Sequence, residues 1–210
     1  MARNLDPKCK QCRRAGEKLF LKGERCFTPK CAVVRRNYPP GIHGIKGGKK
    51  KLSEYGFQLR EKQKAKKEYG LMEGQFKLTF KKAKEQKGDM SENFLKLLET
   101  RLDNVVYRLG FASSRSQARI LVSHGHFLVD DKKVNIPSYN LKKGHVIKIK
   151  QSSQRKKIFN ILPEKLKKTE APAWLNLDAK ELTGKILHSP VLNEIKTNID
   201  AQAVIGFYSR

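Results

Sequence analysis

The segment NFLKLLETRLDNVVYRLGFASSRSQARILVSHGH, residues 93–126, carries the most regular hydrophobic pattern in the chain. In its first half, apolar residues recur every three or four positions, which places them on one face of a helix. Gly110 follows the last of them and is a typical helix terminator. The pattern predicts one helix over residues 93–110, and Asp89 and Glu92 precede it at the spacing of a capping box. The residues of its inner face are Phe94, Leu98, Leu102, Val105 and Leu109.

A second helix is predicted directly after this one. Ser114 and Gln117 have the spacing of another capping box, and Gly125 ends the apolar pattern. Arg115 and Arg119 are one turn apart on the outer face of this helix. The two helices and their short connection predict a helix-turn-helix. The residues expected to face inward on the second helix are Ala118, Leu121 and Val122.

Alternating apolar residues predict strands after the helix-turn-helix. In HFLVDDKKVNI, Phe127 and Val129 are expected to lie opposite Val134 and Ile136 in a hairpin. The stretch HVIKIK, which begins at His145, predicts a further strand. These segments together predict a small antiparallel sheet.

Residues 53–86 predict two more helices, with Ser53 as the first cap and Gly70 as the break between them. Phe76 and Phe80 lie one turn apart on the inner face of the second helix. Lysine and arginine greatly outnumber acids here, so the acids cannot pair with all of them. A surface that faces phosphates is therefore a better interpretation than an ordinary solvated face.

The composition of the whole chain points to a polyanionic partner. The 210 residues carry a formal net charge of +26, with a pI of about 10.1 and a hydrophobic fraction of 38%. Charge repulsion of this size destabilises a compact chain unless counter-charge is near, and nucleic acid is the first candidate. No run approaches the ~20 apolar residues of a membrane span, and the N-terminus lacks the apolar core of a secretion signal. We therefore expect a cytoplasmic protein without a membrane partner.

All four cysteines lie near the N-terminus, at Cys9, Cys12, Cys26 and Cys31. A C-x2-C pair and a C-x4-C pair supply four sulfur ligands, which suits a structural zinc ion with tetrahedral coordination. The neighbouring lysines and arginines would stabilise the thiolates. Four unrelated buried thiols and a redox dithiol are weaker alternatives. An iron–sulfur cluster, which also takes four thiolates, stays open.

The segment RRNYPPGIHGIKGGKKK, residues 35–51, is basic and contains six prolines and glycines, which exclude long regular elements. Such an arm gains order against RNA or DNA, and the alternative is a disordered linker. Tyr38 and His43 could stack on bases. His124 and His126 flank Gly125 at a helix end; helix-end capping explains one of them, and RNA contact is the favoured interpretation for both.

The chain resembles the bacterial small-subunit ribosomal protein S4 family, in its four-cysteine form. The resemblance rests on the cysteine spacing, RRNYPPGIHG, SEYGFQLREKQKAKKEYG, LLETRLDNVVYRLGFASSRSQAR, NIPSY and the C-terminal IGFYSR. It implies an α+β fold: a zinc-bearing N-terminal segment with a basic arm (1–45), a mainly α-helical domain (46–92, completed by 175–210) and an inserted S4 RNA-binding domain (93–174).

The resemblance also implies a function. It implies a structural constituent of the small ribosomal subunit that binds the 5′ domain of small-subunit (16S) rRNA and nucleates assembly. The expected neighbours are ribosomal protein S5, through which decoding accuracy is influenced, and messenger RNA where it enters the subunit. The expected metal is zinc, held by the four cysteines, with an iron–sulfur cluster as the alternative.

The candidate RNA-binding residues are cationic, aromatic or polar side chains spread along the chain. They are Arg3, Arg13, Arg14, Lys22, Lys30, Arg35, Arg36, Tyr38, His43, Lys49, Lys50, Lys51, Arg60, Lys62, Arg101, Arg108, Ser114, Arg115, Gln117, Arg119, His124 and His126.

Two other functions fit the sequence less well. An RNA-modifying enzyme with the same RNA-binding domain needs a catalytic domain, and only 60 residues follow residue 150. In those residues Asp178 and Asp200 are far apart and no glycine-rich catalytic loop is present. A zinc-containing DNA-binding regulator is compatible with a helix-turn-helix, but seldom spreads positive charge over its whole length. We therefore expect no enzymatic activity.

Overall fold

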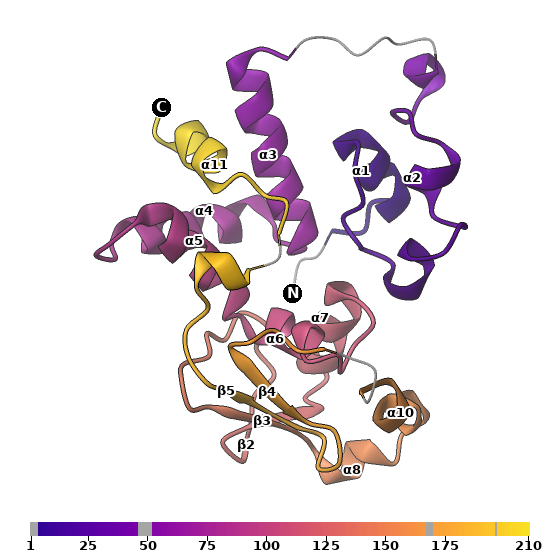
Figure 1. The fold of residues 1–210 in the computed structure, drawn as a ribbon, viewed down its shortest axis with the longest axis vertical. Helices are drawn as coiled ribbons and strands as arrows, with labels where there is room; N and C mark the ends of the chain where they lie inside the picture. Colours follow the sequence, from indigo (N-terminus) through magenta and orange to yellow (C-terminus); the bar gives the residue numbers. More distant parts are fainter. Residues whose placement is uncertain (1–3, 46–51, 167–169, 196) are drawn as a thin grey trace. The chain divides into compact units, whose positions relative to one another are not determined.

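The computed structural model describes residues 4–45, 52–166, 170–195 and 197–210 (Figure 1). The chain divides into two compact units. One comprises residues 1–94 with 197–210, and the other comprises residues 95–196. The first is helical and the second combines helices with an antiparallel sheet, so the α+β class is confirmed.

Short helices and turns build the N-terminal part of the first unit. Cys12, Ala15, Leu19 and Leu21 form a small core of their own in it. Because so few apolar side chains are buried here, hydrophobic burial gives this segment little stability. Its elements are α1 (Lys8–Ala15), η1 (Gly23–Cys26), α2 (Ala32–Arg35) and η2 (Ile42–Gly44).

The predicted pair of helices over residues 53–86 is confirmed. They are α3 (Glu54–Glu68) and α4 (Glu73–Lys84). The Ser53 hydroxyl caps α3 by accepting a hydrogen bond from the N–H of Gly56 at 3.2 Å. Gly70 lies in the left-handed region (φ 64°), which explains why the chain turns there.

The C-terminal helix α11 (Ala201–Tyr208) packs along α3 (Figure 1). The carboxylate of Glu61 on α3 accepts a hydrogen bond from the N–H of Asp200 at 3.2 Å, next to the start of α11. At the other end, the Tyr208 hydroxyl donates to Glu73 at 2.8 Å and the Tyr208 ring packs against Phe80. The end of the chain is therefore part of the core of the first unit.

The second unit begins within α5 (Met90–Glu99), which is followed by α6 (Leu102–Arg108) and α7 (Arg115–Ser123). As predicted, Asp89 caps the start of α5: its carboxylate accepts from the N–H of Glu92 at 2.9 Å. Ser114 caps α7 in the same way, accepting from the N–H of Gln117 at 3.3 Å. The predicted helix-turn-helix corresponds to α6 and α7, which pack against each other.

The prediction of a single helix over residues 93–110 is wrong, because α5 and α6 are separate. Arg101, between them, has an extended backbone (φ −64°, ψ 138°) and forms a bridge with Asn140. The N–H of Leu102 donates to the carbonyl oxygen of Tyr139 at 2.8 Å. Hydrogen bonds to a segment far along the chain thus replace helical ones at this junction, and local periodicity carries no signal of them.

A five-stranded antiparallel sheet lies beside these helices, in the order β2-β1-β3-β5-β4 (Figure 1). Phe127, Ile147, Ile149 and Ile186 contribute its most deeply buried side chains to the core of the unit. Its strands are β1 (Phe127–Val129), β2 (Lys132–Lys133), β3 (Val146–Ile149), β4 (Leu175–Asp178) and β5 (Thr183–Ile186).

The hairpin turns earlier than expected. Val129 pairs with Lys132, and Asp130 and Asp131 make the turn with φ angles of 48° and 63°. Positive φ at both central residues is the mark of a two-residue hairpin turn, and aspartate tolerates that conformation. The predicted hairpin is confirmed, but the predicted partner of Val129 is wrong, because Val129 lies opposite Lys132 rather than Val134 or Ile136.

Residues 175–196 do not complete the helical domain, as the predicted division at residue 174 required. They belong to the second unit, because β5 pairs with β3 and β4 pairs with β5. β5 also packs closely on the helices: a side chain at Gly184 would collide with Leu109 at the end of α6. Only residues 197–210 return to the first unit.

Between β3 and β4, the described residues 150–166 and 170–174 contain three short helices. Phe159 buries its ring against His126 and Phe127, so this connection is anchored in the core. His126 also shares a hydrogen bond of 2.9 Å with Ser153. The helices are α8 (Gln151–Gln154), α9 (Lys157–Asn160) and α10 (Leu162–Leu166), and the last short element of the unit is η3 (Leu192–Glu194).

The contacts of Glu73 predict an acid-sensitive attachment of α11. Burial would raise the pKa of Glu73, but hydrogen bonds from Lys66, Lys62 and Tyr208 lower it to about 2, against an ordinary value of 4.5. The carboxylate therefore stabilises the fold above pH 4.5 and loses this contribution as the pH falls toward 2. Because the side chain is 46% exposed, solvent screening limits the contribution to about 1 kcal/mol.

We expect Glu73→Gln to lower the free energy of unfolding by that amount at neutral pH, measured by urea denaturation. The difference from the parent should shrink as the pH falls from 4.5 to 2. Glu85→Gln, at an exposed position at the end of α4, is the matched control and should have little effect at any pH. A difference between Glu73→Gln and the parent that is constant with pH would contradict this account.

Candidate nucleic-acid interface and cysteine site

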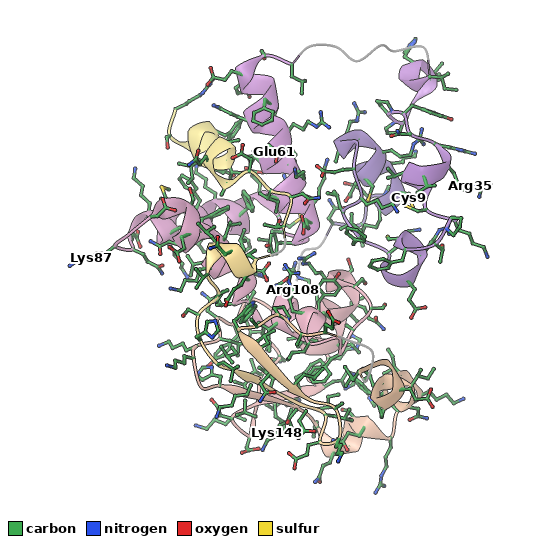
Figure 2. The ribbon with its side chains drawn as sticks, in the orientation of Figure 1. Cys9, Arg35, Glu61, Lys87, Arg108 and Lys148 are labelled. Carbon is green, nitrogen blue, oxygen red and sulfur yellow. The ribbon has the colours of Figure 1, made fainter. Side chains whose placement is uncertain are left out.

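The four cysteines line one small cavity in the N-terminal segment. Cys9 and Cys12 are one turn apart on α1, Cys26 ends η1 and Cys31 immediately precedes α2. Cys12, Cys26 and Cys31 are buried, and Cys9, labelled in Figure 2, is half-buried. The rest of the cavity is lined by apolar side chains such as Leu21 and by basic ones such as Arg25.

The backbone around the cysteines is arranged to stabilise sulfur with negative charge. The N–H of Lys22 donates to the sulfur of Cys26 at 3.4 Å. Burial raises the pKa of Cys12, the backbone N–H of Leu19 lowers it, and the three other thiols raise it further. The four sulfurs are thus close enough to repel one another as thiolates, which a bound cation would relieve.

The donor set fits a metal that prefers sulfur, but the sulfurs do not converge on one point. In the part of the chain that the structure describes, no three cysteine, histidine or acidic side chains are close enough together to hold a metal ion. A zinc ion in the cavity would draw the four sulfurs inward, since Zn–S bonds are about 2.3 Å long. The cysteines are therefore gathered around one site without being in ligand geometry.

Two of the predicted RNA-binding cations are buried within the fold. Lys62 is paired with Glu73 at 2.9 Å and lies over the ring of Phe207, and its side chain is only 8% exposed. Arg101 forms a two-point pair with Asp103, at 3.0 and 2.8 Å, and its side chain is 4% exposed. Both side chains are engaged inside their units, so neither is available to a phosphate.

Glu99 organises the cations around α6. This glutamate is 1% exposed and accepts two hydrogen bonds from Arg108, at 3.0 and 2.7 Å, and one from Asn104 at 2.8 Å. Asn104 in turn accepts a hydrogen bond from Nε of Arg115 at 2.8 Å. The guanidinium of Arg115 also lies 4.8 Å from the centre of the Tyr107 ring. A continuous polar network therefore runs from a buried carboxylate to Arg115 on α7.

The four arginines that were predicted to form one RNA-binding surface have different partners in the structure. Arg108, labelled in Figure 2, is neutralised by Glu99, as Arg101 is by Asp103. Arg115 and Arg119 are half-buried on α7, and Nε of Arg115 donates to Asn104. Burial lowers the pKa of Arg119, and the charge of Asp103 opposes this effect. Arg115 and Arg119 are the two charged residues of α7.

Ser114 and Gln117 act in capping rather than at an open surface. Ser114 is buried and caps α7, while the Gln117 side chain accepts from the N–H and hydroxyl of Ser113 at 2.8 and 2.6 Å. Their polar atoms stabilise the turn that presents Arg115.

In the N-terminal segment, Arg13 and Arg60 hold the backbone in place. Arg13 donates to the carbonyl oxygens of Tyr38 and Pro39, at 2.9 and 3.2 Å, and stacks over the Tyr38 ring at 4.6 Å. Arg60 of α3 donates to the carbonyl oxygen of Ala15 at the end of α1. The start of the basic arm is therefore fixed against α1 within this unit.

Other predicted cations of this unit are on its surface. Arg35 extends away from α2 (Figure 2). Arg14 lies close enough to Lys67 of α3 to affect it: burial lowers the pKa of Lys67, and the charges of Lys66 and Arg14 lower it further. Like charges held this close favour an external anion. The exposed residues among those predicted in this unit are Arg14, Lys22, Lys30, Arg35, Arg36, His43 and Arg60, the last of which also donates to Ala15.

Comparison with known proteins gives the family. Residues 3–99 match the family described as Ribosomal protein S4/S9 N-terminal domain, and residues 100–147 match the S4 domain. The small ribosomal subunit protein uS4 of Heliobacterium modesticaldum is 52% identical over all 210 residues of both chains. The proteins of the same name from Caldicellulosiruptor saccharolyticus and Thiobacillus denitrificans are 52% and 49% identical, again over the full length.

The chain belongs to the uS4 family. It is a structural constituent of the small ribosomal subunit, and the family is one of ribosomal proteins rather than enzymes. The matched S4 domain ends at residue 147, so β4 and β5 extend its sheet beyond the matched residues. No described helix of this uS4 chain is both long enough and apolar enough to cross a membrane.

The two histidines at the end of α7 differ in this uS4 chain. His124 is exposed, whereas His126 is buried against Phe159 and bonded to Ser153. Burial lowers the pKa of His126, as do the charges of Lys156 and His124. His126 is therefore a neutral core residue at physiological pH, and only His124 is placed to meet a ligand. The predicted residues Arg3, Lys49, Lys50 and Lys51 lie outside the described residues.

Sequence reasoning missed Asn104 and Tyr107, which orient Arg115. Both lie within the apolar pattern of α6, where an asparagine that is 1% exposed needs hydrogen-bond partners. A polar asparagine among the apolar residues of a helix was the signal from which a buried hydrogen-bond network could have been predicted. Lys66 and Lys67 were also passed over, because a run of lysines on a helix does not reveal which of them a fold crowds together.

Proposed function

We propose that this uS4 chain binds the 5′ domain of small-subunit (16S) rRNA and nucleates assembly around it. The observation that carries the proposal is the fixed position of Arg115, held by Asn104 and Tyr107 on a helix with no acid in its first turn. Phosphate contacts dominate the affinity of proteins for nucleic acid, and arginines that are already oriented lose little entropy on binding.

The net charge supports the same proposal. Glu61, Glu73, Glu99 and Asp103 are engaged with cations of their own unit, so they do not neutralise the exposed ones. The chain as a whole keeps a formal charge of +26. Structured RNA is the polyanion that this chain meets in the small subunit.

The RNA-facing set follows from exposure together with the hydrogen-bond partners that the structure gives each side chain. Lys62, Arg101, Arg108, Ser114, Gln117 and His126 are assigned to the fold, and Arg13 and Arg60 to holding the backbone. Tyr38 stays in the set because Arg13 covers only one face of its ring and the residue is half-exposed. The residues proposed to meet RNA are Arg14, Lys22, Lys30, Arg35, Arg36, Tyr38, His43, Arg115, Arg119 and His124, with Arg3, Lys49, Lys50 and Lys51 from outside the described part.

We also propose that Cys9, Cys12, Cys26 and Cys31 hold one structural zinc ion. Four thiols around one cavity and the N–H of Lys22 on Cys26 support it. The hydrophobic core of this segment has only four residues and contributes little folding free energy. A bound metal ion could therefore supply much of the folding free energy of the segment. Iron bound as an iron–sulfur cluster is the competing outcome, since it uses the same ligands.

The family resemblance alone supports three further proposals. The chain would contact ribosomal protein S5 and influence decoding accuracy there. It would lie near the messenger RNA as it enters the subunit. The ribosomes that carry it would be cytoplasmic.

The rRNA proposal predicts that Arg115→Ala and Arg119→Ala each weaken binding to a transcript of the 16S 5′ domain about five- to thirtyfold at moderate salt. Each lost phosphate contact should also reduce the salt dependence of the binding constant by close to one unit. Filter binding over a range of KCl concentrations measures both quantities.

Arg155→Ala is the matched control, because it removes the same charge from an exposed position of the same unit. It should change the affinity less than twofold. If all three variants bind alike, only net charge matters and α7 is not the contact surface.

The zinc proposal predicts one zinc per chain in protein purified under reducing conditions. Cys26→Ser should abolish metal binding and unfold the N-terminal ~45 residues, while the second unit, which has its own core, keeps its thermal transition. Thr28→Ala, in the loop between the two cysteines of the second pair, should retain the metal. Elemental analysis that finds neither zinc nor iron would refute a metal site, and iron would assign a cluster.

A further inference from the structure

Two phenylalanines of the cysteine-bearing segment form a stacked pair on its surface. The rings of Phe20 and Phe27 are 5.1 Å apart between centres, with 29° between their planes. Phe27 is 72% exposed, more than any other aromatic side chain among the described residues. Leaving one face of a large apolar ring in water forgoes the free energy that its burial would give.

The backbone holds Phe20 in an unfavourable conformation. Its φ angle is 49°, in the left-handed region that is unfavourable for a residue with a side chain. Leu19 and Leu21, on either side, are buried in the small core with Cys12, whereas Phe20 lies outside that core against Phe27. The strain therefore places Phe20 behind Phe27 rather than in the core.

The position of Phe27 is also fixed. It directly follows Cys26, and its N–H donates to the carbonyl oxygen of Glu24 at 3.0 Å across the turn of η1. A ring that is backed by a second ring and anchored by its backbone loses little freedom when something stacks on its open face.

The neighbouring charges favour one kind of partner. Lys22, Arg25 and Lys30 are all exposed and lie within five residues of Phe27, with Glu24 as the one acid in that stretch. An aromatic face among cations is the combination by which proteins bind unpaired nucleotides: the base stacks on the ring and the flanking phosphates meet the cations. A protein partner would instead favour a contiguous apolar patch with few cations.

We propose that Phe27, backed by Phe20, is a stacking platform for one unpaired RNA base, with Lys22, Arg25 and Lys30 at the flanking phosphates. This site rests on the proposed rRNA binding and adds to it a place where single-stranded RNA is held. It differs in kind from α7, which is proposed to bind phosphates of a structured junction.

The test compares full-length Phe27→Ala, Phe27→Leu and Phe27→Trp with the parent in binding to the 16S 5′-domain transcript. Phe27→Ala and Phe27→Leu should bind about tenfold more weakly, because leucine keeps the apolar bulk but has no ring. Phe27→Trp should bind within about twofold of the parent. Its added fluorescence should be quenched when RNA is added, against the background of Trp174, which is 1% exposed.

Each other outcome overturns the site. If Phe27→Leu binds like the parent, the contact is merely apolar. If Phe27→Ala also binds RNA like the parent but fails to enter the assembled subunit, the platform faces a protein. The metal content and thermal transitions of the three variants, which should match the parent because the ring is exposed, separate a lost contact from a lost fold. Failure of the parent itself to bind the transcript would instead remove the proposed rRNA binding, and this site with it.

Discussion

The hydrogen bonds of Glu99 join the end of α5 to α6. This carboxylate is almost completely buried in a chain with 26 excess positive charges, and it is satisfied by two bonds from Arg108 and one from Asn104. A buried carboxylate without such partners would be destabilising by several kcal/mol. Asn104 bonds both Glu99 and Arg115. One acid at the end of α5 therefore stabilises the packing of α6 and, through Asn104, the orientation of Arg115 on α7.

Acids of the first unit have a similar role. Glu61 receives Lys64 and the N–H of Asp200, and Glu73 receives Lys62, Lys66 and Tyr208. Burial would lower the pKa of Lys64, but its bonds to Glu61 and Glu17 raise it, so this buried lysine stays charged. In both units, a few acids form ion pairs with particular lysines and arginines in the interior. Other lysines and arginines lie at the surface. The positive charge available to RNA is thus decided by which cations the fold has not paired.

Much of the fold follows from local pattern. The boundaries of α3 and α4, the caps at Ser53, Asp89 and Ser114, and the break at Gly70 are all set by residues within one or two turns of the feature they determine. The strand β3 and the helix-turn-helix were predicted for the same reason. These features depend on contacts between near neighbours, and single-sequence reasoning captures such contacts.

The features that sequence reasoning missed depend on distant partners. The split between α5 and α6 needs hydrogen bonds with residues near Tyr139, whose carbonyl oxygens accept from the start of α6. Strands β4 and β5 join the sheet only because β5 pairs with β3, which is distant in the sequence. The burial of Lys62 and Arg101 likewise requires Glu73 and Asp103 to be placed beside them. From composition alone, these basic residues were predicted to contact RNA. Their ion pairs with these two acids show that they stabilise the fold instead. The cysteine cluster could be foreseen from its spacing, but Asn104, Tyr107 and the Phe20–Phe27 pair could not, since each acts through a neighbour that the spacing does not reveal.

The claim that the fold itself orients the RNA-facing arginines can be tested directly on Arg115 in the free protein. The measurement is the hydrogen-exchange rate and nitrogen relaxation of its Nε–H group by NMR, with the exposed Arg155 as the internal reference. Our account predicts slow exchange and restricted motion for Nε–H of Arg115, because Asn104 accepts its hydrogen bond before any RNA is present. Exchange and motion equal to those of Arg155 would show that Arg115 is ordered only on binding, and would contradict it.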